Sequence, residues 1–279
     1  MTELSGATAL ITGGASGIGR LLAERLADRG TTLVLWDRDA AALQGAVAAL
    51  KDRGAAAHGY HLDITDRAAV ADTAATVGAE VGAVDVVVNN AGVVSGKPLL
   101  ELSDADIERT FAVNTLALYW VTRAFLPGMI QRGHGHVVTI ASAAGLLGVA
   151  RQTDYSASKH AAVGFDESLR VELHRTAPGV RTTVICPYFI NTGMFDGVKT
   201  RVPWLLPILE QTEVATRIAV AIERDEPKVI MPWAIRTLPL LRVLPTRLFD
   251  RAMDLLGVNV SMQEFHGRVI ADSPLIRLP

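Results

Sequence analysis

Length, composition and charge narrow the classes of protein to consider. The chain has 279 residues, of which 49% are hydrophobic, and a net charge of -2. It therefore lacks the surplus of basic residues that would indicate nucleic-acid binding. Its single cysteine, Cys186, excludes an internal disulfide and a cysteine-based zinc cluster. The N-terminus lacks the pattern of a signal peptide, and no apolar run reaches the ~18 residues that span a bilayer. We expect a cytoplasmic protein that binds neither nucleic acid nor metal.

Short runs rich in β-branched residues alternate with Ala-rich segments of helical length. The predicted strands are residues 7–12, 31–37, 56–63, 85–90, 136–142, 181–187 and 228–232. The predicted helices are residues 17–29, 39–53, 66–81, 103–132, 153–176 and 212–224. This alternation predicts βαβ units with right-handed crossovers. We expect one Rossmann-type, doubly wound α/β domain over residues 1–279, with a mainly seven-stranded parallel sheet and helices on both faces.

A glycine-rich turn joins the first predicted strand to the first predicted helix. Residues 12–19 read "TGGASGIG", with glycines at positions 13, 17 and 19. Glycines allow a tight turn and a close backbone approach, and the N–H groups of the following helix can bind a pyrophosphate. Because a strand precedes the turn and a helix follows it, the pattern indicates a dinucleotide site.

An acidic residue follows at the distance that such a site requires. Asp37 ends the second predicted strand, 18 residues after Gly19, where a carboxylate can accept hydrogen bonds from the adenosine ribose. The carboxylate would repel a 2'-phosphate, which favours NAD over NADP. The neighbouring Arg38 could instead pair with that phosphate, so NADP stays the less favoured alternative.

Polar residues also end the later strands, at the edge where open α/β sheets bind ligands. Asp63 ends the third strand, "NNAG" (89–92) the fourth, and Ser142 the fifth. Tyr155 and Lys159 are four residues apart on the next helix and therefore share a face. A tyrosine acts as a base near neutral pH only if its pKa falls from about 10 by about three units. The positive charge of a nearby ammonium lowers the pKa of a tyrosine.

This ordered set resembles the classical short-chain dehydrogenase/reductase family. The residues that carry the resemblance are Thr12-Gly13-x3-Gly17-x-Gly19, Asn89-Asn90-Ala91-Gly92, Asn114, Ser142 and Tyr155-x3-Lys159. They span residues 12 to 159, and the likeness of the remaining strands extends to about residue 232. The resemblance implies that Tyr155 is the acid–base group and that Ser142 orients the substrate. It also implies that Lys159 binds the nicotinamide ribose and lowers the tyrosine pKa, and that Asn114 holds a water linking Lys159 to solvent.

The same resemblance implies a set of dinucleotide contacts. They are Thr12, Gly13, Ser16, Gly17, Ile18, Gly19, Asp37, Arg38, Asp63, Ile64, Asn90, Ala91, Gly92, Tyr155, Lys159, Pro187, Ile190 and Thr192. Pro187 and Thr192 match the family's Pro-x4-Thr after the sixth strand. Tyr188 departs from the family because glycine is usual there, and its side chain would narrow the nicotinamide side of the pocket.

Two further stretches are similar to the retinol dehydrogenase and 17-beta-hydroxysteroid dehydrogenase branch: "CPYFINTGMF" (186–195) and "LGVNVSMQEFHGR" (256–268). The implied substrate is an apolar alcohol or carbonyl compound of steroid, retinoid or long-chain lipid type. A 3-oxoacyl-thioester reductase and a non-catalytic dinucleotide sensor stay open as alternatives. The likeness also implies a homodimer or homotetramer that assembles through the helices at 103–132 and 153–176.

Residues 193–210 lie where the family has a substrate-covering segment. The apolar residues expected to line the substrate site there are Met194, Phe195, Val202, Trp204, Leu205, Leu206, Ile208 and Leu209.

Residues 233–279 form a predicted C-terminal extension. Within it, residues 233–251 hold four arginines against Asp250 alone. A helix is predicted from Thr246 to Leu256, with Gly257 as its stop. The residues expected on its apolar side are Leu248, Phe249, Ala252, Met253, Leu255 and Leu256. Two interpretations stay open for this face: peripheral contact with an anionic bilayer, or packing on the same or a partner subunit.

Overall fold

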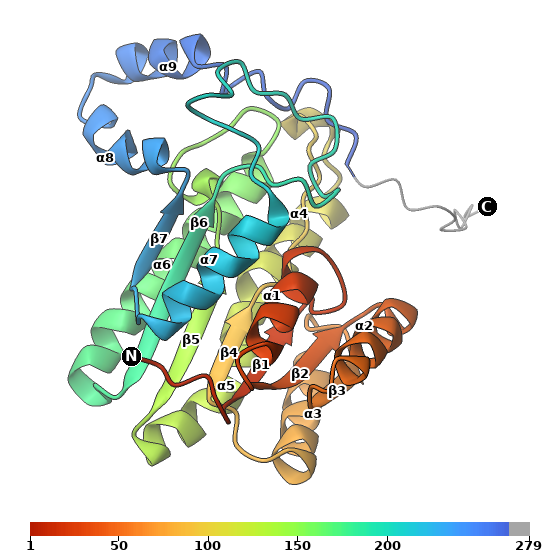
Figure 1. Ribbon diagram of the computed structural model, residues 1–279. Helices are drawn as coiled ribbons and strands as arrows, with labels where there is room; N and C mark the ends of the chain where they lie inside the picture. The colour runs from red at the N-terminus through yellow and green to blue at the C-terminus, as the bar shows by residue number, and fades with distance from the viewer. Residues whose placement is uncertain (268–279) are drawn as a thin grey trace.

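The computed structural model describes residues 1–267, which are built around one sheet of seven parallel strands (Figure 1). The strands are β1 (Thr8–Thr12), β2 (Thr32–Asp37), β3 (Ala57–His61), β4 (Val86–Asn89), β5 (Gly135–Ile140), β6 (Val180–Pro187) and β7 (Lys228–Met231). Their order is β3-β2-β1-β4-β5-β6-β7, and every neighbouring pair is parallel. The predicted Rossmann-type sheet is confirmed. Its strand order reverses between β1 and β4, the position where such sheets bind ligands.

Helices cover both faces of the sheet. They are α1 (Gly17–Ala27), α2 (Ala40–Asp52), α3 (Arg67–Glu80), α4 (Asp104–Phe111), α5 (Ala117–Arg132), α6 (Thr153–Thr176), α7 (Gln211–Glu223), α8 (Leu238–Leu241) and α9 (Thr246–Leu255). The apolar core on one face joins the sheet to α1, α2 and α7, and the core on the other face joins it to α3, α5 and α6. In β1, Ala9 and Ile11 belong to the first core and Leu10 to the second, because successive strand side chains point to opposite faces.

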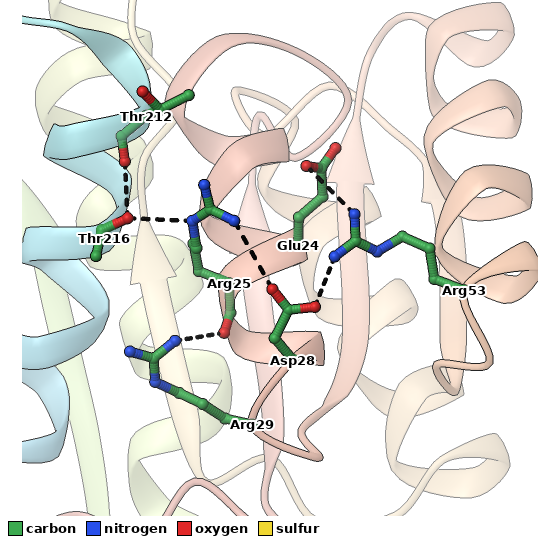
Figure 2. Close-up of polar contacts among 7 residues, drawn as sticks. All are labelled: Glu24, Arg25, Asp28, Arg29, Arg53, Thr212 and Thr216. Carbon is green, nitrogen blue, oxygen red and sulfur yellow. Dashed lines mark hydrogen bonds and ion pairs between the residues drawn. The ribbon is translucent and has the colours of Figure 1, made fainter.

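Polar contacts tie α1 to its two neighbours on the surface (Figure 2). The Arg25 Nε donates to Thr216 Oγ1 of α7 at 3.1 Å, and Arg25 Nη1 lies 3.7 Å from Asp28. Arg53, just after α2, donates to Asp28 at 2.6 Å and lies 4.0 Å from Glu24. Exposed ion pairs contribute about 0–1 kcal/mol each. The apolar faces beneath them therefore hold these helices in place.

The long helix predicted at 103–132 is wrong in one respect, because the structure divides it. A π-helical turn, Ala112–Leu116, separates α4 from α5. Such a turn adds one residue to the helical repeat, and it is common at functional sites. Hydrophobic periodicity does not reveal a one-residue insertion, so the sequence pattern reads as continuous. The turn contains Asn114.

The segment at 193–210 and the C-terminal elements gather over the carboxyl edge of the sheet (Figure 1). The helix predicted to end before Gly257 is confirmed as α9, and Gly257 has a φ of 75°. Met253 is buried in a third apolar cluster, which also contains Leu206, Ile235 and Leu238, and Phe249, Ala252 and Leu256 pack against it. The apolar face of α9 therefore packs on its own chain.

Two leucines predicted on that face are exposed instead. Leu248 and Leu255 are 49% and 73% exposed, because α9 contacts the chain along a stripe narrower than the predicted one. Residues 268–279 of the predicted extension lie outside the described residues. Within residues 1–267, no helix combines the length and apolarity needed to cross a membrane.

Candidate active site

A cavity of about 460 Å³ lies at the carboxyl edge of the sheet, where its strand order reverses. The residues predicted to bind a dinucleotide or act on a substrate come together in its wall. Those lining it are Gly13, Ser16, Gly17, Ile18, Asp37, Arg38, Asp63, Ile64, Asn90, Ala91, Gly92, Ser142, Tyr155, Lys159, Pro187, Ile190 and Thr192. Thr12, Gly19 and Asn114 are set back behind this wall, where they hold other residues in position.

The glycine-rich turn has no room for side chains at its two ends. Gly13 has a φ of 63°, a backbone conformation that favours glycine. A Cβ on Gly19 would lie 2.2 Å from the Gly13 carbonyl oxygen and 2.5 Å from Asn90 Nδ2. Asn90 Nδ2 donates to the carbonyl oxygens of Thr12 and Gly13, at 2.9 and 3.1 Å. The turn is thus fixed against the end of β4.

Thr12 makes the second connection between β1 and β4. Its Oγ1 accepts hydrogen bonds from the backbone N–H groups of Asn90 (3.0 Å) and Ala91 (3.1 Å). Thr12 is buried, while Asn90 and Ala91 line the cavity. The Thr12 hydroxyl therefore fixes the backbone of Asn90 and Ala91 where these residues line the cavity.

The Asp37 carboxylate is held in a fixed orientation at the end of β2. Its Oδ2 accepts from the Ala15 N–H at 3.0 Å, and its Oδ1 accepts from the Asp39 N–H at 3.1 Å. Arg38 also lines the cavity. A fixed carboxylate beside the glycine-rich turn has the geometry that binds ribose hydroxyls.

Ser142, Tyr155 and Lys159 meet on the opposite side of the cavity. The Lys159 Nζ donates to the Ile140 carbonyl oxygen at 2.8 Å and lies 5.8 Å from the centre of the Tyr155 ring. Ser142 Oγ accepts from the Ala144 N–H at 3.1 Å and donates to the Pro187 carbonyl oxygen at 3.4 Å. These three side chains are buried, and they surround one space.

The pKa values of this group are governed by burial. Burial raises the pKa of Tyr155 to about 12, and a hydrogen bond with Ser142 acts in the opposite direction. Burial lowers the pKa of Lys159 to about 8. Burial therefore outweighs the hydrogen bond in setting the pKa of Tyr155, and the lowering expected from Lys159 together with the nicotinamide charge stays a prediction.

Asn114 holds the segment that follows β4. Its Oδ1 accepts from the Val93 N–H and its Nδ2 donates to the Val93 carbonyl oxygen, both at 2.9 Å. The Nδ2 also lies 3.1 Å from Ser158 Oγ. A Cβ on Gly92 would lie 3.4 Å from Asn114 Oδ1 and 3.6 Å from Lys159 Nζ. The π turn thus brings the Asn114 amide next to Lys159 across Gly92.

Aromatic rings pack together next to Tyr155. The Tyr155 ring packs edge-on against Phe195 at 5.8 Å, and Phe195 contacts Phe189 at 5.2 Å and Phe265 at 6.4 Å. A Cβ on Gly96 would lie 2.1 Å from Phe265, so the C-terminal segment also closes on the loop after β4. Phe189, Phe195 and Phe265 form this aromatic roof, and Gly96 of the loop after β4 packs against it.

The predicted substrate-covering segment contributes less lining than expected. Within the described chain, Met194 and Phe195 are the members of that set that line the cavity. Leu206 is buried in the third apolar cluster, with Val202, Leu205 and Leu209 packed against it, whereas Trp204 is 81% exposed. Most of the segment packs on the C-terminal elements rather than on the site.

Other lining residues were not predicted as contacts. They are Trp36, Asp39, Ala42, Leu62, Val93, Val113, Ile140 and Ala141; Tyr188, expected to narrow the pocket, also lines the cavity. Most of them are immediate neighbours of predicted residues, so adjacency in sequence was the signal available. Tyr188 is buried, and burial raises its pKa to about 12. In residues 1–267, no group of three or more His, Cys, Asp or Glu side chains is placed to hold a metal.

Comparison with known proteins identifies the family. The family model described as short chain dehydrogenase matches residues 7–202. The chain belongs to the short-chain dehydrogenase family. It is 41% identical to mouse (Mus musculus) epidermal retinol dehydrogenase 2 over 95% of this chain and 87% of that protein. It is 42% identical to human (Homo sapiens) estradiol 17-beta-dehydrogenase 11 over 88% of this chain and 81% of that protein.

Solved structures of short-chain dehydrogenases show the same architecture. One from Burkholderia phymatum, in complex with NAD, has a TM-score of 0.79 and 31% identity, over 87% of this chain and 95% of that chain. A metagenomic short-chain oxidoreductase in complex with NADP has a TM-score of 0.71 and 31% identity, over 82% and 98%. As a short-chain dehydrogenase, the protein is an oxidoreductase acting on CH–OH groups with a nicotinamide dinucleotide as cofactor.

Proposed function

We propose that this short-chain dehydrogenase uses NAD(H) to interconvert an alcohol with a ketone or aldehyde on a large apolar substrate. The observation that carries the proposal is the single cavity that joins Ser142, Tyr155 and Lys159 to the glycine-rich turn, beneath the aromatic roof. The names of the two relatives, a retinol and an estradiol dehydrogenase, support a retinoid- or steroid-like compound. Apolar walls favour such a compound by about 25 cal/mol per Å² of surface buried.

The residues of the cavity have distinct roles in this proposal. A bound oxidised nicotinamide dinucleotide would supply the hydride acceptor and a positive charge. In the alcohol oxidation, Tyr155 in its phenolate form takes the hydroxyl proton as the alcohol carbon gives up hydride, and in the reverse direction the phenol returns the proton. Ser142 donates a hydrogen bond to the reacting oxygen. Lys159 binds the ribose and adds its charge, and Asn114 holds the loop after β4 next to it.

The residues at the other end of the cavity fit a dinucleotide. The Gly19 position leaves no room for a Cβ, and α1 begins at the cavity wall, where first-turn N–H groups can face phosphate. The Asp37 carboxylate is oriented by two backbone N–H groups. Its negative charge opposes a 2'-phosphate, so we assign NAD as the preferred cofactor over NADP.

Tyr155→Phe tests the proposed reaction. The variant should lose at least the 10²–10⁴-fold in kcat that general acid–base groups contribute, with NADH affinity nearly unchanged. Tyr119→Phe is the matched control, since Tyr119 lies on the surface of α5, packs against Phe165, and should retain full activity. Formation of reduced nicotinamide from apolar alcohols measures both. Full turnover by Tyr155→Phe would contradict the proposal and favour a dinucleotide sensor.

We also infer a peripheral contact with anionic membranes through the rim around α8 and α9. Large apolar side chains are exposed there: Trp204, Trp233, Leu240 and Val243 are 81%, 67%, 75% and 84% exposed. Arg236, Arg242, Arg247 and Arg251 of residues 233–251 are exposed as well, and cationic groups near apolar ones favour anionic lipid surfaces. Flotation with anionic vesicles at low and high salt tests this. Protein that stays unbound at low salt would exclude the contact.

A further inference from the structure

A buried glutamine stands next to the proposed reaction centre without a structural role. Gln152 immediately precedes α6, three residues before Tyr155, and is 1% exposed. Its side chain does not cap the helix. Across residues 1–267, neither Oε1 nor Nε2 of this side chain has a hydrogen-bond partner. Burying an amide without partners destabilises the folded state, so a group that pairs with this amide would stabilise the protein.

The glutamine lines a small hollow that adjoins the reaction centre. The hollow has a volume of about 20 Å³, and Ser142 and Tyr155 also line it. Apolar side chains, among them Leu147, Phe189 and Phe195, form most of the remaining wall. A space of this size holds one water-sized group, and none of its lining residues is charged.

We propose that Gln152 determines substrate specificity by binding a second, neutral oxygen of the substrate, on a carbon next to the one that reacts. This inference rests on the proposed function, in which Ser142 and Tyr155 hold the first oxygen. An amide both donates and accepts, which matches a hydroxyl, or a carbonyl through Nε2 alone. A carboxylate would lack a cation here. Among large apolar alcohols of the proposed retinoid- or steroid-like type, the favoured substrates are therefore those that carry a vicinal diol or a 2-hydroxy ketone.

The size of the hollow sets how close the two oxygens must be. Ser142, Tyr155 and Gln152 border a space of about 20 Å³, so a second oxygen several carbons away would fall outside it. Most of the remaining wall is apolar. Besides Ser142, Tyr155 and Tyr188, the amide of Gln152 is therefore the polar group of this wall that the second oxygen can contact. A substrate without the second oxygen would leave Gln152 unpaired.

Two alcohols that differ by one hydroxyl test the proposal: cyclooctanol and cyclooctane-1,2-diol. We would measure the dissociation constant of each from the NAD-saturated protein, and kcat/KM from the formation of reduced nicotinamide. The wild type should favour the diol by about 10- to 100-fold in both measurements. Gln152→Met, which keeps the length of the side chain, should abolish this preference. Gln131→Met on the exposed surface of α5 is the matched control and should keep it.

Thermal unfolding supplies a second readout that does not depend on turnover. Because Gln152→Met removes two unpaired polar atoms from a buried position, its unfolding temperature should equal or exceed that of the wild type. A lower unfolding temperature, with equal losses for both alcohols, would make Gln152 structural and overturn the proposal. Equal affinity of the wild type for the two alcohols would also overturn it. Absence of turnover with every alcohol would contradict the proposed function instead, and the dissociation constants would still decide the role of Gln152.

Discussion

Thr12→Val removes one hydroxyl from behind the cofactor cavity while keeping the shape of the side chain. In the wild type, Thr12 Oγ1 accepts from the N–H groups of Asn90 and Ala91, at 3.0 and 3.1 Å. Valine cannot accept, so both N–H groups would lose their partner. Each unpaired buried group costs about 1–3 kcal/mol. Because Asn90 and Ala91 are partly exposed, water replaces part of this loss, and we expect about 2 kcal/mol in total.

The matched control for this change is Thr12→Ser, which keeps the hydroxyl and loses one methyl group. Its loss of unfolding free energy should be about 1 kcal/mol, from the buried methyl alone. Cofactor affinity separates the two variants more sharply than stability does. Asn90 and Ala91 line the cavity, so Thr12→Val should weaken NADH binding by about tenfold, which corresponds to about 1.4 kcal/mol. Thr12→Ser should bind NADH as the wild type does.

Urea unfolding and a fluorescence titration with NADH measure these two quantities. A Thr12→Val variant with both the unfolding free energy and the NADH affinity of the wild type would contradict this prediction. Equal losses of NADH affinity in Thr12→Ser and Thr12→Val would also contradict it, because the hydroxyl would then not be the group that matters.

Four further outcomes are expected. Asp37→Ala should narrow the preference for NAD over NADP in kcat/KM, and an unchanged ratio would point to other residues. Phe265→Ala should open the aromatic roof and raise KM for large apolar alcohols more than for small ones; equal effects would place Phe265 outside the substrate path. Because the pKa of Tyr155 is raised to about 12, its phenolate fraction grows with pH, while Lys159, with a pKa of about 8, keeps its charge below that pH. We therefore expect kcat/KM for alcohol oxidation to rise from about pH 6 to 8, and a flat profile would contradict this. Hydrogen bonds from Lys97 and Ser103 lower the pKa of Asp106 to about 2. The ionised carboxylate therefore stabilises the folded state above about pH 4, and this effect is lost as the pH falls toward 2. The difference in unfolding temperature between the wild type and Asp106→Asn should accordingly shrink in acid.

The sequence predicts the sheet and the cofactor turn well because both depend on local patterns. β-branched runs alternate with helical segments, and the structure has a strand or helix at each predicted position except where 103–132 is divided. Gly13 and Gly19 are required by backbone geometry that any sequence with this turn must satisfy. The polar strand ends meet because parallel strands place their carboxyl ends at one edge.

The parts that the sequence does not predict depend on packing between distant segments. Phe265 reaches Gly96 and Phe195, and no periodicity connects positions so far apart. The exposure of Leu248 and Leu255 depends on how wide a stripe α9 buries, which the helical pattern alone leaves open. The unpaired amide of Gln152 is also invisible in the sequence, since a glutamine before a helix is ordinarily a surface residue.

The pair Tyr155 and Lys159 shows where sequence spacing stops being informative. A separation of four residues on a helix places both groups on one face, and the structure has them at 5.8 Å from ammonium to ring centre. Spacing carries no information about desolvation, which raises the pKa of the phenol to about 12 and lowers that of the ammonium to about 8. The raised pKa of Tyr155 opposes loss of the phenol proton near neutral pH, and the lowered pKa of Lys159 reduces the fraction of the charged ammonium beside it. The fold therefore supplies the position of the acid–base pair, and we expect the positive charge of a bound nicotinamide to contribute to the stabilisation of the phenolate.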